Sequence, residues 1–115
     1  MKRTLSIAAM AFGLIVLASA CTAEAASMEA IKASFPASQH AKAVSIAECE
    51  SGLNPEAVSR GGGNWGLFQI NKVHAPTLKK MGYDWSEITD PLVNAKLARK
   101  IYDESGWKAW SCNRH

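Results

Sequence analysis

The first 25 residues follow the order of a secretory signal peptide, and this leaves only about 90 residues to build a fold. Lys2 and Arg3 precede an apolar run over residues 7–20, and small residues of the cleavage type follow. The run is shorter than the roughly 20 residues that a membrane-spanning helix needs, and it lacks charged residues at its end. We therefore predict a signal peptide over 1–25 and one exported domain over 26–115.

Cys21 leaves a second processing route open. Residues 17–21 loosely resemble a bacterial lipoprotein site, in which the cysteine becomes the lipidated first residue. Such sites usually have leucine three places before the cysteine, and Ala18 stands there in this chain. We favour cleavage after Ala25, which gives a secreted, periplasmic or cell-wall-associated protein without stable membrane insertion.

Cys49 and Cys112 are the thiols that remain in the exported domain. An even pair in an oxidising compartment predicts one disulfide. Such a long closed loop stabilises a fold by about 4 kcal/mol in the chain-entropy description, and a domain with so small a core needs that cross-link. His40, His74 and His115 are scattered and no paired-cysteine motif is present, so we expect neither a metal nor an organic cofactor.

Charge indicates which partners suit the protein. The formal net charge is +3, and the lysines and arginines are spread along the chain. No basic stripe of the kind that binds nucleic acid is present, so we expect no nucleic-acid partner. A mild positive charge suits an acidic polymer such as a bacterial cell wall.

Helical patterns dominate the exported domain. We predict helices over 28–34, 38–51, 76–81 and 90–105, with Ser38 as the cap of the second. Proline or glycine follows each predicted helix and would end it. The fold class is therefore α-dominated α+β, a helical lobe with a small β-hairpin and one disulfide.

The last predicted helix carries the clearest signals. Asp90 is a good N-cap, Pro91 fits the first helical position and Gly106 would terminate the helix. Trp107 and Trp110 follow on a short turn, and we expect Trp110, beside the disulfide, to lie in the core. The residues with helical spacing that should face the core are Leu92, Val93, Leu97, Ile101 and Tyr102.

A small β-hairpin or an extended segment is expected in the middle of the domain. Residues 61–64 supply a flexible, glycine-rich turn, and residues 65–71 are β-prone and mostly apolar. Gln69 and Asn71 alternate with apolar residues and would project to one face. Amides beside indoles suit a sugar-binding groove, and Trp65 is the indole that we expect at the surface; the alternative is that the tryptophans belong to the core.

Glu50 is the candidate catalytic residue. At about 100° per residue, Ala43, Ile46, Ala47 and Glu50 share one face of a helix, whereas Glu48 points to the flank. A carboxyl group on an apolar face loses hydration, so its pKa should rise, and the protonated acid could donate to a leaving oxygen. The alternative is a solvated acid or a structural ion pair at a helix end.

Two segments at this spacing resemble the signature of lytic transglycosylases and of the wider lysozyme-like superfamily. They are ESGLNP followed by AVS, and then GLFQI, within residues 50–70. The C-terminal part, from ITD to WKAW within residues 88–110, is similar to animal-type lysozymes. A cysteine before the glutamate, with its partner after the last tryptophan, is similar to the resuscitation-promoting factors of actinobacteria. The resemblance covers about residues 41–112 and implies a lysozyme-like fold.

The resemblance implies roles for individual residues. Glu50 matches the family's catalytic acid, and Trp107 matches the tryptophan that packs on it. Gln69 and Asn71 match substrate-contacting positions, and Ser59 matches a cleft serine. The predicted substrate-binding set is Ser59, Asn64, Trp65, Gln69, Asn71 and Trp107.

Asn64 departs from the pattern of animal-type lysozymes, which have a second carboxylate at this position, two residues before Gly66. A retaining glycosidase needs that charge, and asparagine does not carry it. The resemblance therefore favours a monomeric lytic transglycosylase that binds peptidoglycan glycan strands and cuts the MurNAc-β-1,4-GlcNAc bond with Glu50 alone. A hydrolytic lysozyme remains an alternative, as does a glycan-binding or lysis-modulating protein without turnover.

Overall fold

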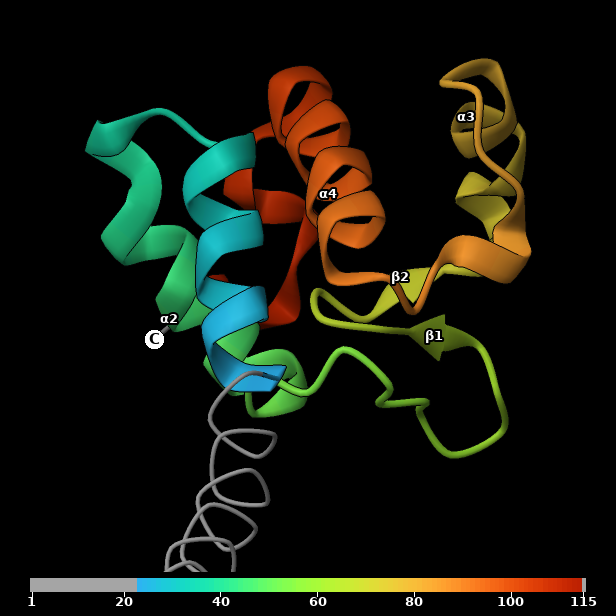
Figure 1. Cartoon of the computed structure of the whole chain (residues 1–115), viewed down its shortest axis with the longest axis horizontal. Helices are drawn as coiled ribbons and strands as arrows, with labels where there is room; N and C mark the ends of the chain where they lie inside the picture. The colour runs from blue at the N-terminus through green and yellow to red at the C-terminus, as the bar shows by residue number, and fades with distance from the viewer. Residues whose placement is uncertain (1–22, 115) are drawn as a thin grey trace, which may run out of the picture.

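The protein, described by a computed structural model over residues 23–114, is a helical lobe with a two-stranded hairpin (Figure 1). Most of the predicted signal peptide, including Cys21 with its alternative lipidation site, lies outside the described residues. Within the described part, no helix is long and apolar enough to cross a membrane.

Residues 23–34 are helical, so this helix includes residues before position 28, where we predicted its start. The added residues are alanine-rich, and Ser27 Oγ lies 3.2 Å from the carbonyl oxygen of Ala23 within the helix. The same hydroxyl lies 3.3 Å from the carbonyl oxygen of Leu53, which ties the helix to the turn after α2. The helix ends before Pro36, as predicted.

Helix α2 (His40–Ser51) carries Glu50 near its end. The predicted cap at Ser38 is wrong, because the chain enters α2 through a 3-10 turn (Ala37–Gln39) whose backbone bonds replace a side-chain cap. The helix ends at Gly52, which adopts φ +65°. The apolar face is confirmed, since Ala43, Ile46 and Ala47 are buried.

The hairpin is confirmed, and so is the glycine-rich turn, which lies just before it: the Gly62 N–H donates to the Ser59 carbonyl oxygen, and an antiparallel bridge joins Val58 to Trp65. A second turn, which the sequence did not predict, closes the hairpin itself. Strand β1 (Asn64–Trp65) pairs antiparallel with β2 (Ile70–Asn71), so the turn is formed by residues 66–69. Gln69 adopts φ +49° and therefore does not continue β2. The interior of this turn, Leu67 and Phe68, is fully buried, because the chain leaves the sheet there to fill the core.

After the hairpin, a 3-10 turn (Lys72–His74) leads into the short helix α3 (Ala75–Lys80), which Figure 1 places apart from α2 and α4. Helix α4 (Pro91–Ser105) starts as predicted, because the Asp90 carboxylate accepts hydrogen bonds from the backbone N–H groups of Leu92 and Val93.

Most of the predicted core face of α4 is confirmed. Val93, Leu97 and Ile101 are buried and Tyr102 packs against the core while partly exposed. The prediction that Leu92 faces the core is wrong. Leu92 is 38% exposed, because it lies in the first turn of α4 and off the buried stripe. Trp110 is buried, as predicted.

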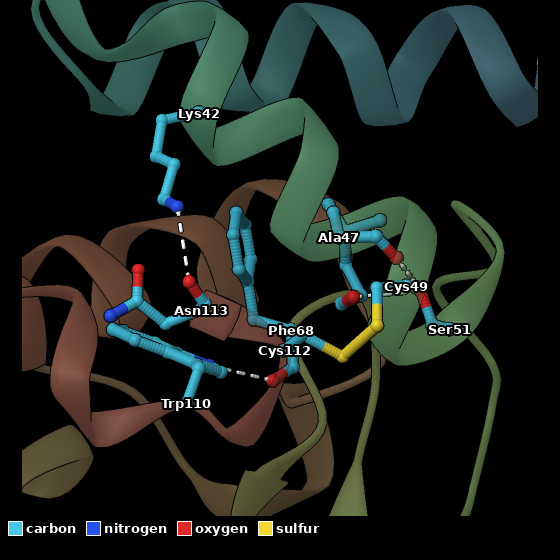
Figure 2. The surroundings of a disulfide bond; sticks show 9 residues. Lys42, Ala47, Cys49, Ser51, Phe68, Trp110, Cys112 and Asn113 are labelled. Atoms are coloured by element: carbon cyan, nitrogen blue, oxygen red, sulfur yellow. Dashed lines mark hydrogen bonds between the residues drawn. A yellow bond between two sulfur atoms is a disulfide. The ribbon is translucent and has the colours of Figure 1, made fainter. Parts of the chain in front are cut away.

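A disulfide joins α2 to the C-terminal segment, as Figure 2 shows. Cys49 bonds to Cys112, which lies in a 3-10 turn (Ser111–Arg114), across a sequence separation of 63 residues. Trp110 lies beside this bond, and its indole N–H donates to the carbonyl oxygen of Phe68 at 3.0 Å. The cross-link therefore holds the end of α2, the hairpin turn and the C-terminus together.

Asn94 is a buried polar residue that the sequence did not single out. Its side-chain Oδ1 accepts from the backbone N–H of Phe68 at 2.8 Å, and its Nδ2 donates to the carbonyl oxygens of Trp65 and Ile88, both at 3.0 Å. Gly66 lies against this amide with φ +79°, where a Cβ atom would meet Asn94 Nδ2 and approach the Ile88 carbonyl oxygen to 2.9 Å. Asn94 thus fixes the hairpin turn to α4.

Removal of the disulfide should destabilise the protein strongly. The cross-link closes a loop of 63 residues and so lowers the conformational entropy of the unfolded chain, which stabilises the folded state by about 4 kcal/mol. The double variant Cys49→Ala/Cys112→Ala should therefore lower the free energy of unfolding by about that amount. Denaturant unfolding of the oxidised protein and of the double variant measures the difference. A loss below about 1 kcal/mol would contradict this role for the cross-link.

Gly66→Ala should destabilise the protein by about 3 kcal/mol, because the new methyl group meets Asn94 in addition to the strain of positive φ. Gly62→Ala is the matched control: its φ is +76°, but no atom lies within 4 Å of the added Cβ, so about 1 kcal/mol is expected. Denaturant unfolding measures both values, and equal losses would show that the Asn94 contact is unimportant.

Candidate active site

One cavity, of about 170 Å³, brings together four of the predicted site residues. Glu50 comes from the end of α2, and Asn64, Gln69 and Asn71 come from the hairpin. The other lining residues are Ile70, His74, Ile101, Ala109, Trp110 and Ser111. Three larger cavities, of about 310 to 360 Å³, contain none of the predicted site residues.

Glu50 is half-buried in this cavity beside the apolar side chains of Ile101 and Trp110. Burial raises the pKa of the Glu50 carboxyl group above its ordinary value of 4.5, and a hydrogen bond from the Cys112 backbone N–H partly offsets the rise. The raised pKa agrees with the prediction made from the position of Glu50 on the apolar face of its helix. A protonated carboxyl group in a cavity can act as a proton donor.

Ser51, next to Glu50, links α2 to the hairpin turn. Its hydroxyl lies 3.1 Å from the carbonyl oxygen of Ala47 and 2.7 Å from that of Leu67, and it accepts from the backbone N–H of Asn54. The two walls of the cavity are therefore joined directly beside the acid.

The amides of the hairpin are tied into the loop as well as facing the cavity. Gln69 Nε2 donates to the carbonyl oxygens of Ala57 at 3.0 Å and Gly66 at 3.1 Å. Asn71 Oδ1 accepts from the backbone N–H of Val73, and Asn71 Nδ2 donates to Asn64 Oδ1 at 3.2 Å. These bonds hold the amides in place before any ligand arrives.

Ser59, Trp65 and Trp107 do not line the cavity. Ser59 Oγ accepts from the backbone N–H of Asn64, and the Trp65 indole N–H donates to the carbonyl oxygen of Gly62. Trp107 stacks on Phe35, with ring centroids 5.2 Å apart, and donates to the Gln39 side chain. In the described part of the chain, it is Trp110 that shares the cavity with Glu50.

His74 also lines the cavity, although no pattern in the sequence assigned it a role there. The three histidines are scattered along the chain, yet the turn after β2 brings His74 to the cavity. Its position three residues after Asn71 was the available signal.

Among the described residues, Glu50 is the only carboxyl group in the lining, and no group of three His, Cys, Asp or Glu residues could hold a metal ion.

Comparison with known proteins identifies the family. A family model described as a lysozyme-like domain matches residues 19–112, so the chain belongs to the lysozyme-like domain family. It is similar to Lysozyme P of Drosophila melanogaster, with 34% identity over 96 residues that cover 72% of this chain and 68% of that protein. No solved structure gives a significant match.

For two further relatives, the matched residues cover a smaller share of the relative's length than they do for Lysozyme P. Lysozyme 2 of Lucilia sericata is 35% identical over 89 residues, which cover 66% of this chain and 63% of that protein. Protein IpgF of Shigella flexneri is 36% identical over 74 residues, which cover 56% of this chain and 49% of that protein. The chain thus spans about half the length of Protein IpgF.

Glu50→Gln should stabilise the protein near pH 7 and leave its stability near pH 3 almost unchanged. Burial raises the folded pKa above the unfolded value, so the unfolded chain ionises first as the pH rises past about 4.5. The wild-type carboxyl group therefore favours unfolding above that pH and not below it, where both states are protonated. Calorimetric midpoints at the two pH values measure the effect.

Glu48→Gln is the matched control, because Glu48 is exposed on the same helix. Because an exposed side chain loses little hydration on folding, Glu48→Gln should change the midpoint near pH 7 less than Glu50→Gln does. A Glu50→Gln variant that is less stable than wild type near pH 7 would contradict the burial of an unfavourable charge.

Proposed function

We propose that the protein cleaves the β-1,4 bond between N-acetylmuramic acid and N-acetylglucosamine in peptidoglycan, as a lytic transglycosylase. The observation that carries this proposal is one carboxyl group, Glu50, with a raised pKa, in a cavity whose other described lining residues include three amides and several apolar groups but no second acid. Membership of the lysozyme-like domain family and the lysozymes among the relatives support it. The predicted signal peptide directs the protein to the periplasm or the cell wall.

The reaction requires Glu50 to act twice. Its protonated carboxyl group gives its proton to the glycosidic oxygen as the bond from that oxygen to C1 of the muramic acid breaks. The acetamido group of the same sugar stabilises the positive charge that develops at C1. The Glu50 carboxylate then accepts the proton of the C6 hydroxyl while O6 bonds to C1, which gives a 1,6-anhydro sugar and regenerates the acid.

The absence of a second carboxyl group favours this route over hydrolysis. A hydrolase with two acids uses one of them to stabilise or attack C1. Among the residues that line the described cavity, Glu50 is the only acid, and Asn64 and Asn71 carry amides. The substrate's own acetamido and C6 hydroxyl groups supply what the protein lacks.

Glu50→Gln should reduce the cleavage of purified peptidoglycan by at least about 100-fold, because an amide is too weak an acid to transfer a proton to the glycosidic oxygen. Mass spectrometry of the soluble products measures both rate and chemistry, and anhydromuropeptides are expected from the unsubstituted protein. Activity should fall as the pH rises above the raised pKa of Glu50, since the ionised form cannot protonate the bond.

Glu48→Gln is the control for charge on α2 and should leave cleavage unchanged. Three outcomes would contradict the proposal in different ways. Near-normal activity of the Glu50→Gln variant would exclude Glu50 as the proton donor. Reducing ends instead of anhydro sugars would make the protein a hydrolase. Intact peptidoglycan with tight glycan binding would make it a binding protein without turnover.

A further inference from the structure

Hydrogen bonds fix the polarity of the Asn64 amide. The backbone N–H of Val73 can only donate, so the Asn71 atom at 2.9 Å from it must be Oδ1. The other end of the Asn71 amide is therefore Nδ2, a donor, and the Asn64 atom that it meets at 3.2 Å must be Oδ1. This leaves Asn64 Nδ2 without a hydrogen-bond partner among residues 23–114, and the assignment follows from a backbone group whose identity is certain.

The backbone of Asn64 is fixed as well. Its N–H donates to Ser59 Oγ at 3.0 Å, and its carbonyl oxygen accepts from the Ser59 N–H at 2.9 Å. Ser59 lies outside the cavity but holds a residue that lines it. Asn64 is thus constrained at the backbone by Ser59 and at the side chain by Asn71, before any ligand arrives.

We propose that Asn64 is a specificity-determining residue that binds the carbonyl oxygen of an N-acetyl group on the glycan. The free Nδ2 group is a hydrogen-bond donor on a half-buried side chain of the cavity, and a carbonyl oxygen is an acceptor without a competing donor. A carbonyl oxygen has two lone pairs, so one stays free for the reacting carbon. The inference rests on the proposed function, because it takes a glycan as the occupant of the cavity.

This donor differs in effect from a carboxylate at the same position. A carboxylate would attract the positive charge at C1 of the sugar, whereas an N–H group repels it and orients an oxygen instead. Because the donor is already held in place, the Asn64 side chain loses little rotamer freedom when it binds an acetamido group. The protein should therefore discriminate N-acetylated sugars from sugars that lack this group.

The test compares two neutral ligands in a Glu50→Gln background, which prevents cleavage. The probes are the β-1,4-linked trimer of N-acetylglucosamine and cellotriose, which has hydroxyl groups in place of the acetamido groups. Titration calorimetry gives the ratio of the two Kd values. NMR of the Asn64 side-chain amide protons shows directly whether one of them shifts with the N-acetylated trimer and not with cellotriose.

Two variants change the donor in different ways. Asn64→Ala removes it. Asn71→Asp keeps the acceptor for the Val73 N–H but cannot donate to Asn64, so the Asn64 amide must turn its Nδ2 toward Asp and present Oδ1 to the cavity. We expect each variant to reduce the ratio of the cellotriose Kd to the Kd of the N-acetylated trimer by about tenfold, a value typical of one hydrogen bond.

Equal weakening of both ligands would overturn the inference, because a variant that merely loosens the hairpin leaves the ratio unchanged. An unshifted Asn64 amide, or no binding of the N-acetylated trimer, would overturn it too. Failure of the proposed function is seen separately, as peptidoglycan left intact by the unsubstituted protein. That result does not depend on the polarity of the Asn64 amide.

Discussion

The contact between the end of α2 and the C-terminal segment governs the environment of Glu50. Cys49 precedes the acid in the chain, and its disulfide partner Cys112 donates a backbone hydrogen bond to the carboxyl group. The same segment brings Trp110 into the cavity and anchors it to the Phe68 carbonyl. One cross-link thus fixes the acid and the apolar surface that removes water from it. The raised pKa of Glu50 follows from this packing, since desolvation is its main cause.

The opposite wall of the cavity depends on polar side chains, because strands of two residues form too few ladder bonds to hold a hairpin. Asn94 binds the hairpin turn to α4 from within the core, and Gly66 makes room for that amide. Ser59 and Asn71 then fix the backbone and the side chain of Asn64. These hydrogen bonds therefore decide which end of the Asn64 amide is engaged within the hairpin and which end is left for a ligand.

Predictions from local patterns succeeded where neighbours in sequence determine the outcome. The face of α2 that carries Glu50 follows from helical spacing alone, and the start of α4 follows from the Asp90 cap. The errors have tertiary causes. Ser38 does not cap, because a 3-10 turn continues into α2, and Gln69 leaves its strand, because the turn before it buries two apolar side chains in the core.

The sequence by itself determined the helical lobe, the disulfide pair and the place of Glu50 on the apolar face of α2, because each rests on residue type and short-range spacing. Only the tertiary structure decided that His74 and Trp110, rather than Trp107, line the cavity with Glu50. It also decided which end of the Asn64 amide is free. The physical reason is that burial and hydrogen-bond partners come from segments far apart in the chain, and their meeting depends on how the hairpin and the C-terminal segment pack against the helices.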